Sequence, residues 1–233
     1  MAALQGRLAL VTGASRGIGA AVAHRLAAEG AHVIAVARTQ GALEELDDAV
    51  RTSGGAATLV PLDLRDFDTI DHMGGALHER FQKLDVLVAC AGVLGSLSPM
   101  GHIDPKLWRE VFDVNVTANY RLIRSLDPLL QRSDSGRAVF VTCAAARDLA
   151  PFWGAYGASK AALEAMVRIY AAEVAKTALK VNLVDPGPVR TRLRAEAFPG
   201  EDRAALKAPE DVTEIFMRLA AADCPHHGKI VSA

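Results

Sequence analysis

A tyrosine and a lysine four positions apart, Tyr156 and Lys160, are the residues of this sequence best suited to acid–base chemistry. They open an alanine-rich helical pattern, and residues at i and i+4 lie on one face of a helix. A free tyrosine has a pKa near about 10, and a neighbouring ammonium favours the phenolate and lowers that pKa. Such a pair could protonate a carbonyl oxygen or deprotonate an alcohol. The spacing alone is weak evidence, because the start of an amphipathic helix often carries Tyr and Lys in this way.

A glycine-rich segment, Thr12–Gly19, follows the first apolar stretch and leads into an alanine-rich helical pattern. Glycines at a strand–helix turn let the backbone approach a pyrophosphate, and the helix N-terminus adds free N–H groups and partial positive charge. The spacing is GxxxGxG rather than GxGxxG, and the Lys-Ser/Thr of a P-loop is missing. The segment predicts a phosphate-binding turn; a glycine-rich turn without a ligand is the alternative.

The end of the second expected strand lacks the acidic residue that commonly grips a ribose 2′-hydroxyl. It reads Val36-Ala37-Arg38-Thr39, and the nearest acids, Glu44 and Glu45, already belong to the next helical pattern. Arg38 offers a planar cation suited to a 2′-phosphate, and Arg16 in the glycine turn could supply a second. We expect NADP(H) to be preferred over NAD(H), although each arginine could also be a solvated surface residue.

Short apolar runs bounded by turn residues alternate with helical patterns along the chain. Most runs are continuously apolar, as expected for a parallel sheet covered by helices on both faces. The expected strands are Leu8–Thr12, His32–Ala37, Ala57–Leu62, Val86–Ala89, Ala138–Thr142, Lys180–Val184 and Lys229–Val231. The expected helices are Gly17–Glu29, Ala42–Thr52, Thr69–Phe81, Lys106–Leu130 (as one helix or divided), Tyr156–Lys176 and Pro209–Ala221. We predict one α/β domain over residues 1–233, a Rossmann fold with a doubly wound parallel sheet of seven or so strands and a ligand crevice at their carboxyl ends.

The composition argues against several functional classes. The 26 basic and 27 acidic residues nearly cancel, and no run of like charge suggests attraction to nucleic acid or membrane. No stretch approaches the ~20 apolar residues of a membrane span, and the first apolar run is too short for a signal peptide. The cysteines Cys90, Cys143 and Cys224 form no CxxC pair, so we expect a reducing cytoplasmic location and no metal site.

Taken in order, these motifs resemble the short-chain dehydrogenase/reductase superfamily over nearly the whole chain. The matches are TGxxxGxG at Thr12–Gly19, Asp63, Ala91-Gly92, Asn115 within Asp113-Val114-Asn115-Val116, the Tyr156–Lys160 pair, and Pro186-Gly187 with Thr191. The resemblance implies an oxidoreductase that interconverts a carbonyl and an alcohol with a nicotinamide cofactor.

The resemblance also implies roles for individual residues. Tyr156 would exchange a proton with the substrate oxygen, while Lys160 would bind the nicotinamide ribose and lower the pKa of the tyrosine. Asn115 would hold a water that links Lys160 to solvent, and Asp63 would accept from the adenine amino group. The expected cofactor contacts are Gly13, Ser15, Arg16, Gly17, Ile18, Gly19, Arg38, Asp63, Leu64, Ala91, Gly92, Asn115, Tyr156, Lys160, Pro186, Gly187, Val189 and Thr191. An ordinary Pro-Gly turn and a merely helix-breaking Asn115 are the alternatives.

One departure from the family pattern is Cys143, thirteen positions before Tyr156, where relatives usually carry a catalytic serine. A thiol is a much weaker donor, and Thr142 beside it should face the other way along a strand. Losing that hydrogen bond would lower the rate about 10- to 100-fold. Cys143 could instead be a nucleophile or redox sensor, or an inert buried residue. It keeps open a rival function, an NADP(H)-binding regulatory or scaffold protein with little catalysis; an isomerase or dehydratase is a third possibility that no charged residue singles out.

The residues expected around the nicotinamide are mostly apolar: Leu94, Ala144, Ala145, Phe152, Trp153, Leu193 and Phe198. They favour a small, neutral or lipophilic carbonyl substrate. A carboxylate or phosphate could instead be received by Arg147, Arg190, Arg192 and Arg194, unless these are solvated. We expect residues 187–203 to form a mobile substrate loop.

Two long helices, Lys106–Leu130 and Tyr156–Lys176, would carry the family's usual subunit contact. Small and apolar residues on the second are consistent with close packing, namely Ala161, Ala162, Ala165, Val167, Ile169 and Ala172, although they could equally face the sheet. We therefore expect a homodimer or a homotetramer.

Overall fold

Seven parallel strands form a single sheet in the order β3-β2-β1-β4-β5-β6-β7. This computed structural model describes residues 3–233, so Met1 and Ala2 of the predicted domain lie outside the described residues. The strands are β1 (Leu8–Thr12), β2 (His32–Ala37), β3 (Ala56–Pro61), β4 (Val86–Ala89), β5 (Arg137–Val141), β6 (Lys180–Asp185) and β7 (Ile230–Ser232). The strand order reverses between β1 and β4, and ligands bind α/β sheets at such switch points, beyond the carboxyl ends of the strands.

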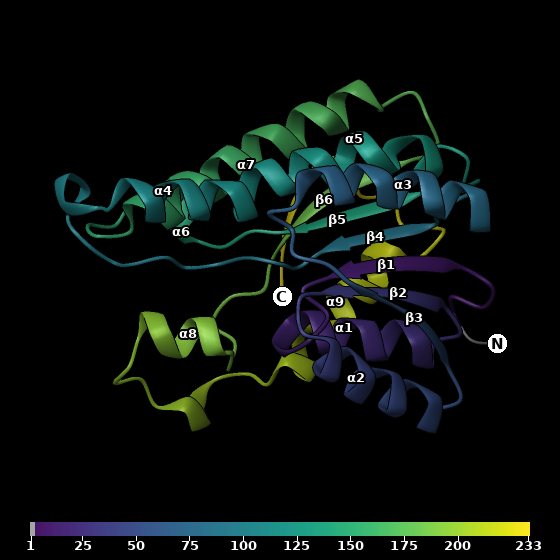
Figure 1. The fold of residues 1–233 in the computed structure, drawn as a ribbon, viewed down its shortest axis with the longest axis horizontal. Coiled ribbons are helices and arrows are strands. Elements are labelled where there is room, and N and C mark those ends of the chain that lie inside the picture. The colour runs from purple at the N-terminus through teal and green to yellow at the C-terminus, as the bar shows by residue number, and fades with distance from the viewer. Residues whose placement is uncertain (1–2) are drawn as a thin grey trace.

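Helices cover both faces of this sheet (Figure 1). One layer consists of α3 (Phe67–Phe81), α4 (Pro105–Phe112), α5 (Ala118–Leu130), α6 (Ala145–Asp148) and α7 (Gly154–Glu173). The other contains α1 (Gly17–Ala28), α2 (Gln40–Thr52) and α9 (Thr213–Ala220), with α8 (Arg192–Ala197) projecting beside it. Short single turns occur at Met100–His102, Arg203–Ala205 and Pro209–Val212. The predicted Rossmann architecture is confirmed.

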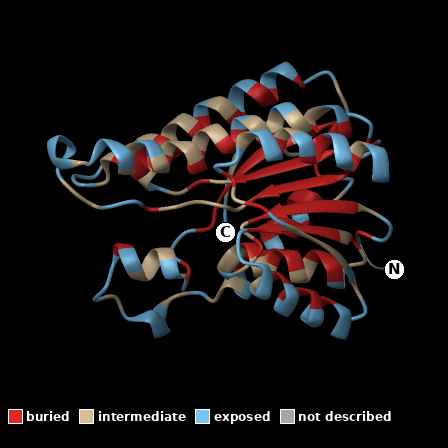
Figure 2. Cartoon of the chain, viewed as in Figure 1, coloured by how far each residue is buried: buried red, intermediate tan, exposed pale blue. Residues whose placement is uncertain are grey.

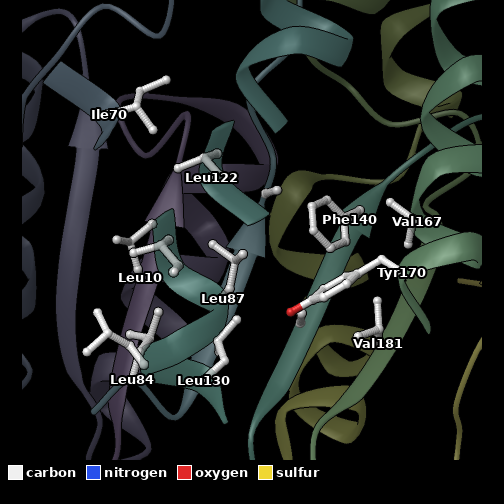
Figure 3. Close-up of a cluster of buried hydrophobic side chains, with 14 of the residues drawn as sticks. Leu10, Ile70, Leu84, Leu87, Leu122, Leu130, Phe140, Val167, Tyr170 and Val181 are labelled. Atoms are coloured by element: carbon white, nitrogen blue, oxygen red, sulfur yellow. The ribbon is translucent and has the colours of Figure 1, made fainter. Parts of the chain in front are cut away.

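Side chains alternate between the two faces of the sheet and build two apolar clusters. Figure 2 shows the inner strands β1, β2, β4, β5 and β6 as almost uniformly buried, whereas the edge strands β3 and β7 are largely of intermediate burial. Leu10, Leu87 and Phe140 point toward α3, α5 and α7, where they join a cluster that includes Leu122 (Figure 3). Val11 and the strand residues that point the same way, such as Ala9, face α1, α2 and α9. Each fully buried side chain of this size contributes about 1.5–3 kcal/mol, so a sheet packed on both faces holds its carboxyl edge rigidly.

The expected helix over Lys106–Leu130 is interrupted. It consists of α4, a π-helical turn at Asp113–Thr117, and α5. Asp104 caps α4 by accepting a hydrogen bond from the backbone N–H of Lys106, and Pro105 occupies the first helical turn. The division that the sequence left open is therefore a π turn, a feature often found at functional sites.

Two short helices lie in segments for which the sequence indicated no helix. The helix α6 follows β5 directly, and α8 occupies part of the expected substrate loop. In α8, the Thr191 side chain accepts from the backbone N–H of Arg194, and Arg192 pairs with Glu196 at 2.7 Å one turn later. Local caps and ion pairs of this kind stabilise a helix of six residues that is too short to show periodicity.

Residues 3–233 include no helix long and apolar enough to cross a membrane. The same residues contain no group of three or more His, Cys, Asp or Glu side chains arranged to hold a metal ion. All three cysteines are free thiols.

Candidate active site

A pocket of about 670 Å³ opens at the carboxyl ends of the central strands, a volume typical of small-molecule sites. Most of the residues expected from the sequence line it: Gly13, Ser15, Arg16, Gly17, Ile18, Gly19, Arg38, Asp63, Leu64, Ala91, Gly92, Cys143, Tyr156, Lys160, Pro186, Gly187, Val189 and Thr191. Asn115 lies behind the wall, fully buried, next to the lining residue Val114. The fold thus brings motifs from the whole chain to one crevice.

The glycine turn between β1 and α1 leaves room for a ligand backbone. Gly13 has a positive φ of 68°, and a Cβ there would lie 3.0 Å from the backbone of Ala91. A Cβ on Gly19 would overlap the carbonyl oxygen of Gly13, so the tight approach of turn and helix requires glycine. At the start of α1, Arg16 supplies no side-chain cap and the first turn has no acidic residue. The N-terminus of α1 therefore suits a pyrophosphate.

Two exposed arginines, Arg16 and Arg38, line the end of the pocket beside β2. Asp63 lies nearby and accepts from the Arg65 guanidinium at 2.6 Å. Hydrogen bonds from Arg65 hold the pKa of the Asp63 carboxyl below its usual value, and the charge of Arg38 adds to this effect. A carboxylate offers about four acceptor positions, so Asp63 retains capacity for a further donor such as an amino group.

Asn115 lies in the π turn and forms hydrogen bonds with three other segments of the chain. Its Nδ2 donates to the Val93 carbonyl at 2.9 Å and to Ser159 Oγ at 3.0 Å, and its Oδ1 accepts from the Val93 N–H at 2.9 Å. Its own carbonyl accepts from the side chain of Asn119. Both amide protons are therefore already donated, so the expected water could bind Asn115 only by donating to Oδ1 or to the backbone carbonyl oxygen.

Tyr156 and Lys160 project from the first two turns of α7 and are only 7% and 4% exposed. Lys160 Nζ donates to the carbonyl of Val141 at 2.9 Å and lies 5.7 Å from the centre of the Tyr156 ring. A Cβ on Gly92 would lie 3.3 Å from Asn115 Oδ1 and 3.6 Å from Lys160 Nζ, so this glycine separates the two polar groups. The pair shares one face of α7, as its spacing predicts.

The ionisation of this pair differs from the sequence expectation. Burial raises the pKa of the Tyr156 hydroxyl well above its ordinary value, and the neighbouring Cys143 and Asp185 add to the rise. Burial lowers the pKa of the Lys160 ammonium, which Cys143 and Glu164 partly offset. The expected lowering of the tyrosine pKa by Lys160 is not seen, because the ammonium faces a carbonyl and the aromatic ring while burial dominates.

Cys143 and Thr142 lie at the end of β5 and face different surroundings. Cys143 packs with Leu94, Tyr156 and Ala197 in a small cluster at the pocket. The Thr142 hydroxyl donates its proton to Glu164 Oε1 at 2.7 Å, beneath α7. A hydroxyl has one proton to donate, so Thr142 cannot supply the donor that a serine at position 143 would give.

The wall beside Tyr156 is largely aromatic and aliphatic. The Trp153 ring lies 5.9 Å from that of Tyr156 and 5.6 Å from that of Phe198, centre to centre. Of the seven apolar residues expected here, five line the pocket: Ala144, Ala145, Trp153, Leu193 and Phe198. Leu94 is instead buried behind this wall, and Phe152 is 58% exposed outside it. Phe152 has a positive φ of 73°, which is uncommon for a bulky residue.

Three of the four arginines considered as anion receptors already have carboxylate partners. Arg147 pairs with both Glu164 and Asp185, and Arg192 pairs with Glu196. Arg194 pairs with Glu201 at 2.5 Å and stacks 3.8 Å above the Phe198 ring. Arg190 lines the pocket and is the one of the four without an ion pair to a residue in 3–233.

Two polar residues near the Tyr156–Lys160 pair were not predicted from the sequence. Glu164 and Asp185 are only 8% and 7% exposed, and both are engaged by Arg147. Glu164 could have been noticed, because it lies one helical turn beyond Lys160 on the same face of α7. Asp185 carries a weaker signal, its place immediately before Pro186-Gly187 at the end of an apolar strand.

Comparison with known proteins gives one consistent result. The family model described as short chain dehydrogenase matches residues 7–202. The chain is 35% identical over 223 residues to the "Uncharacterized oxidoreductase YciK" of Escherichia coli, covering 94% of this chain and 88% of that one. The solved structure of yciK from E. coli superposes with a TM-score of 0.95, covering 99% and 96% of the two chains at 35% identity.

Two further similar structures contain a cofactor. A short chain dehydrogenase from Shigella flexneri, complexed with NADP, has a TM-score of 0.95 at 34% identity and covers 99% of this chain and 98% of its own. One from Escherichia coli, complexed with NADPH, has a TM-score of 0.93 at 34% identity with the same coverage.

Proposed function

The chain belongs to the short-chain dehydrogenase family of oxidoreductases, and from this premise we propose that it is an NADP(H)-dependent enzyme acting on a small, lipophilic carbonyl compound or alcohol. The observation that carries the proposal is that the glycine turn and the Tyr156–Lys160 pair line the same pocket. A dinucleotide reaching from the glycine turn to Tyr156 would bring its nicotinamide to the catalytic pair.

In this proposal Tyr156 is the proton donor for carbonyl reduction. The bound cofactor supplies or accepts the hydride. Because burial raises the pKa of Tyr156, its hydroxyl stays protonated at neutral pH, the form that an acid catalyst needs. Lys160, held by the Val141 carbonyl, presents its ammonium toward the nicotinamide ribose, and Asn115 fixes the position of α7 through Ser159.

Cys143 takes the place of the usual serine in the proposed site. Its packing against Tyr156 brings the thiol to the substrate oxygen, where it gives at most a weak hydrogen bond. Catalysis then depends more heavily on Tyr156 than in relatives with a hydroxyl at this position. The thiol keeps a second candidate function in view, an NADP(H)-binding regulatory or scaffold protein with little turnover.

The preference for NADP(H) over NAD(H) is supported by charge at the end of β2. Arg38 and Arg16 line the pocket there, and no acidic residue closes the strand. A guanidinium recognises a 2′-phosphate through paired N–H donors. The NADP and NADPH found in two similar structures support the same preference. We assign the remaining cofactor contacts to the glycine turn, Asp63, Leu64, Ala91-Gly92 and residues 186–191.

The walls beside Tyr156 support a neutral, lipophilic substrate. Trp153, Leu193 and Phe198 supply apolar surface, and Arg194 is held by Glu201. A guanidinium already paired with a carboxylate has little attraction left for a second anion. We propose that residues 187–203, with α8, form the loop that covers this substrate.

We propose that the enzyme is a homodimer or homotetramer joined through α5 and α7. Tyr120 on α5 is 50% exposed and Ile169 on α7 is 61% exposed, which is unusual for large apolar side chains. Val167, by contrast, packs into the core, so only part of the predicted α7 set is free for such a contact. Gel filtration of Ile169→Asp should show a smaller assembly than the unsubstituted chain, with Arg218→Asp as the control.

The test of function is turnover of a panel of ketones and aldehydes with NADPH and NADH, repeated with Tyr156→Phe. An oxidoreductase reduces at least one carbonyl above background, and the Phe variant loses that activity while still binding NADPH. Cofactor binding without any turnover would favour the regulatory or scaffold alternative. Full activity in the Phe variant would remove the proposed role of Tyr156.

A further inference from the structure

Arg147 bridges two buried carboxylates behind the catalytic pair. Its Nη1 donates to Glu164 Oε1 on α7, and its Nη2 donates to Asp185 Oδ2 at the end of β6. Glu164 and Asp185 are 8% and 7% exposed, and a carboxylate this deeply buried needs a compensating charge. The arginine side chain is itself 40% exposed, so it reaches from the surface of α6 to the interior.

Each carboxylate also holds a second group that shapes the pocket. Asp185 Oδ1 accepts from the backbone N–H of Gly187 at 3.1 Å, just beyond Pro186. Glu164 Oε1 accepts from the Thr142 hydroxyl at 2.7 Å. Three segments therefore meet at one guanidinium: the chain after β5 with Cys143, the helix α7 one turn beyond Lys160, and the loop that begins at Pro186.

The charges of this group act on the two catalytic side chains. Tyr156 is faced by Cys143 from the end of β5, by Asp185 from β6 and by Lys160 from its own helix. Lys160 is faced by Cys90 from the end of β4, by Cys143, and by Glu164. With Arg147 present, the three charged groups of the bridge sum to one negative charge. Without it, the Asp185 carboxylate that faces Tyr156 would be uncompensated and would oppose formation of a phenolate there.

We propose that Arg147 is a positioning residue for the reaction: by pairing with Glu164 and Asp185 it fixes the Pro186-Gly187 loop against α7 and offsets the charge of the Asp185 carboxylate that faces Tyr156. This inference rests on the proposed function for its kinetic consequences, although its structural consequences can be measured without turnover. Two linked effects follow from the geometry. Loss of the bridge loosens the cofactor loop, and loss of the positive charge makes Tyr156 harder to ionise.

The experiment compares Arg147→Gln, Arg147→Lys and the double variant Arg147→Gln/Asp185→Asn with the unsubstituted chain. Arg218→Gln is the control, because Arg218 is exposed on α9 and its replacement removes one positive charge away from the pocket. For Arg147→Gln we expect NADPH to bind about tenfold more weakly. We also expect the rise in the rate of alcohol oxidation with pH to occur about one pH unit higher.

The two other variants separate charge from geometry. Arg147→Lys keeps the charge but not the paired N–H donors. The oxidation rate should therefore rise at the same pH as in the unsubstituted chain, while NADPH binding recovers only in part. The double variant again leaves one negative charge, so its oxidation rate should also rise at the pH seen in the unsubstituted chain. The amide that replaces the Asp185 carboxylate retains an oxygen that can accept from the Gly187 N–H. Arg218→Gln should match the unsubstituted chain in both measurements.

Ionisation of Tyr156 can also be read directly, because the chain contains only three tyrosines. Carbon-13 labelling at tyrosine Cζ gives a small set of NMR signals, and Tyr156→Phe identifies the one that matters. The signal should titrate at higher pH in Arg147→Gln than in the unsubstituted chain. If no protein in the series reduces a carbonyl, the proposed function fails while this titration and NADPH binding still test the bridge. Unchanged NADPH affinity and an unchanged Tyr156 titration in Arg147→Gln would overturn the inference. Equal losses of NADPH affinity in all three Arg147 variants, with no shift in the pH dependence of oxidation, would also overturn it.

Discussion

Lys160 donates from Nζ to the carbonyl oxygen of Val141 at 2.9 Å, so the ammonium is held by the end of β5 rather than by the hydroxyl of Tyr156. The same ammonium lies over the Tyr156 ring, 5.7 Å from its centre. The tyrosine hydroxyl is consequently left in a buried setting that raises its pKa. This arrangement favours a protonated Tyr156 at neutral pH, which is the form that the proposed carbonyl reduction uses.

The pH dependence of the two reaction directions should therefore differ. Reduction uses the protonated hydroxyl, so its rate should stay level through the neutral range and fall only above the raised pKa of Tyr156. Oxidation uses the deprotonated form, so its rate should climb with pH across the same range. Steady-state rates in both directions over a pH series provide the measurement. An oxidation limb that levels off below pH ~8 would contradict the raised pKa.

Cys143→Ser should make the enzyme faster. A hydroxyl at this position restores one hydrogen bond to the substrate oxygen, which corresponds to about 10- to 100-fold in kcat. Cys143→Ala is the matched control, because it removes the thiol without adding a donor, and it should stay within about threefold of the unsubstituted enzyme. Assays at saturating NADPH with one reduced carbonyl compare the three proteins. A serine variant slower than the alanine variant would mean that the thiol itself contributes to catalysis.

Most of the fold could be predicted from the sequence, because the strands are continuous apolar runs punctuated by turn residues. The runs at His32–Ala37 and Val86–Ala89 match β2 and β4 end for end. The π turn could not be predicted, since no residue type or spacing within Asp113–Thr117 is specific to a π-helical turn. Its wider turn accompanies the tertiary hydrogen bonds of Asn115 to Val93 and Ser159, which no local pattern encodes.

The candidate site was predictable where a motif carries the chemistry, and not where distant segments pair. Helical spacing places Tyr156 and Lys160 on one face, and the other motifs in order along the chain identify them as a candidate catalytic pair. The bridge from Arg147 to Asp185 joins residues separated by 38 positions on different elements, so its existence depends on how α6 and β6 dock. The rise in the pKa of Tyr156 also depends on burial, which becomes known only once α7 is packed against the sheet.

Arg38→Gln should weaken NADPH far more than NADH. The substitution removes a guanidinium beside the expected 2′-phosphate, and a charge-assisted hydrogen bond of this kind is worth about 1.5–3 kcal/mol, or roughly 10- to 100-fold in KM for NADPH. Because NADH lacks that phosphate, its KM should change little. Arg51→Gln on the outer part of α2 serves as the control. Parallel KM titrations measure the ratio, and equal losses for both cofactors would exclude Arg38 as the phosphate partner.

Two adjacent glycines in α3 should respond in opposite ways to alanine. A Cβ on Gly74 would overlap Ser125 Oγ and lie 2.6 Å from the Ser125 carbonyl oxygen on α5, whereas one on Gly75 would meet no atom within 4 Å. Gly74→Ala must therefore push α3 away from α5 and should lower the free energy of unfolding by about 1–3 kcal/mol. Gly75→Ala changes only helix propensity in open space and should raise that free energy by about 0.5–1 kcal/mol. Urea denaturation of both variants measures the pair under identical conditions, and each serves as the control for the other. Since α3 and α5 lie on the face of the sheet that also carries α7, loosening by Gly74→Ala should also lower NADPH turnover. A stable, fully active Gly74→Ala protein would show that α5 can shift without disturbing the position of Asn115.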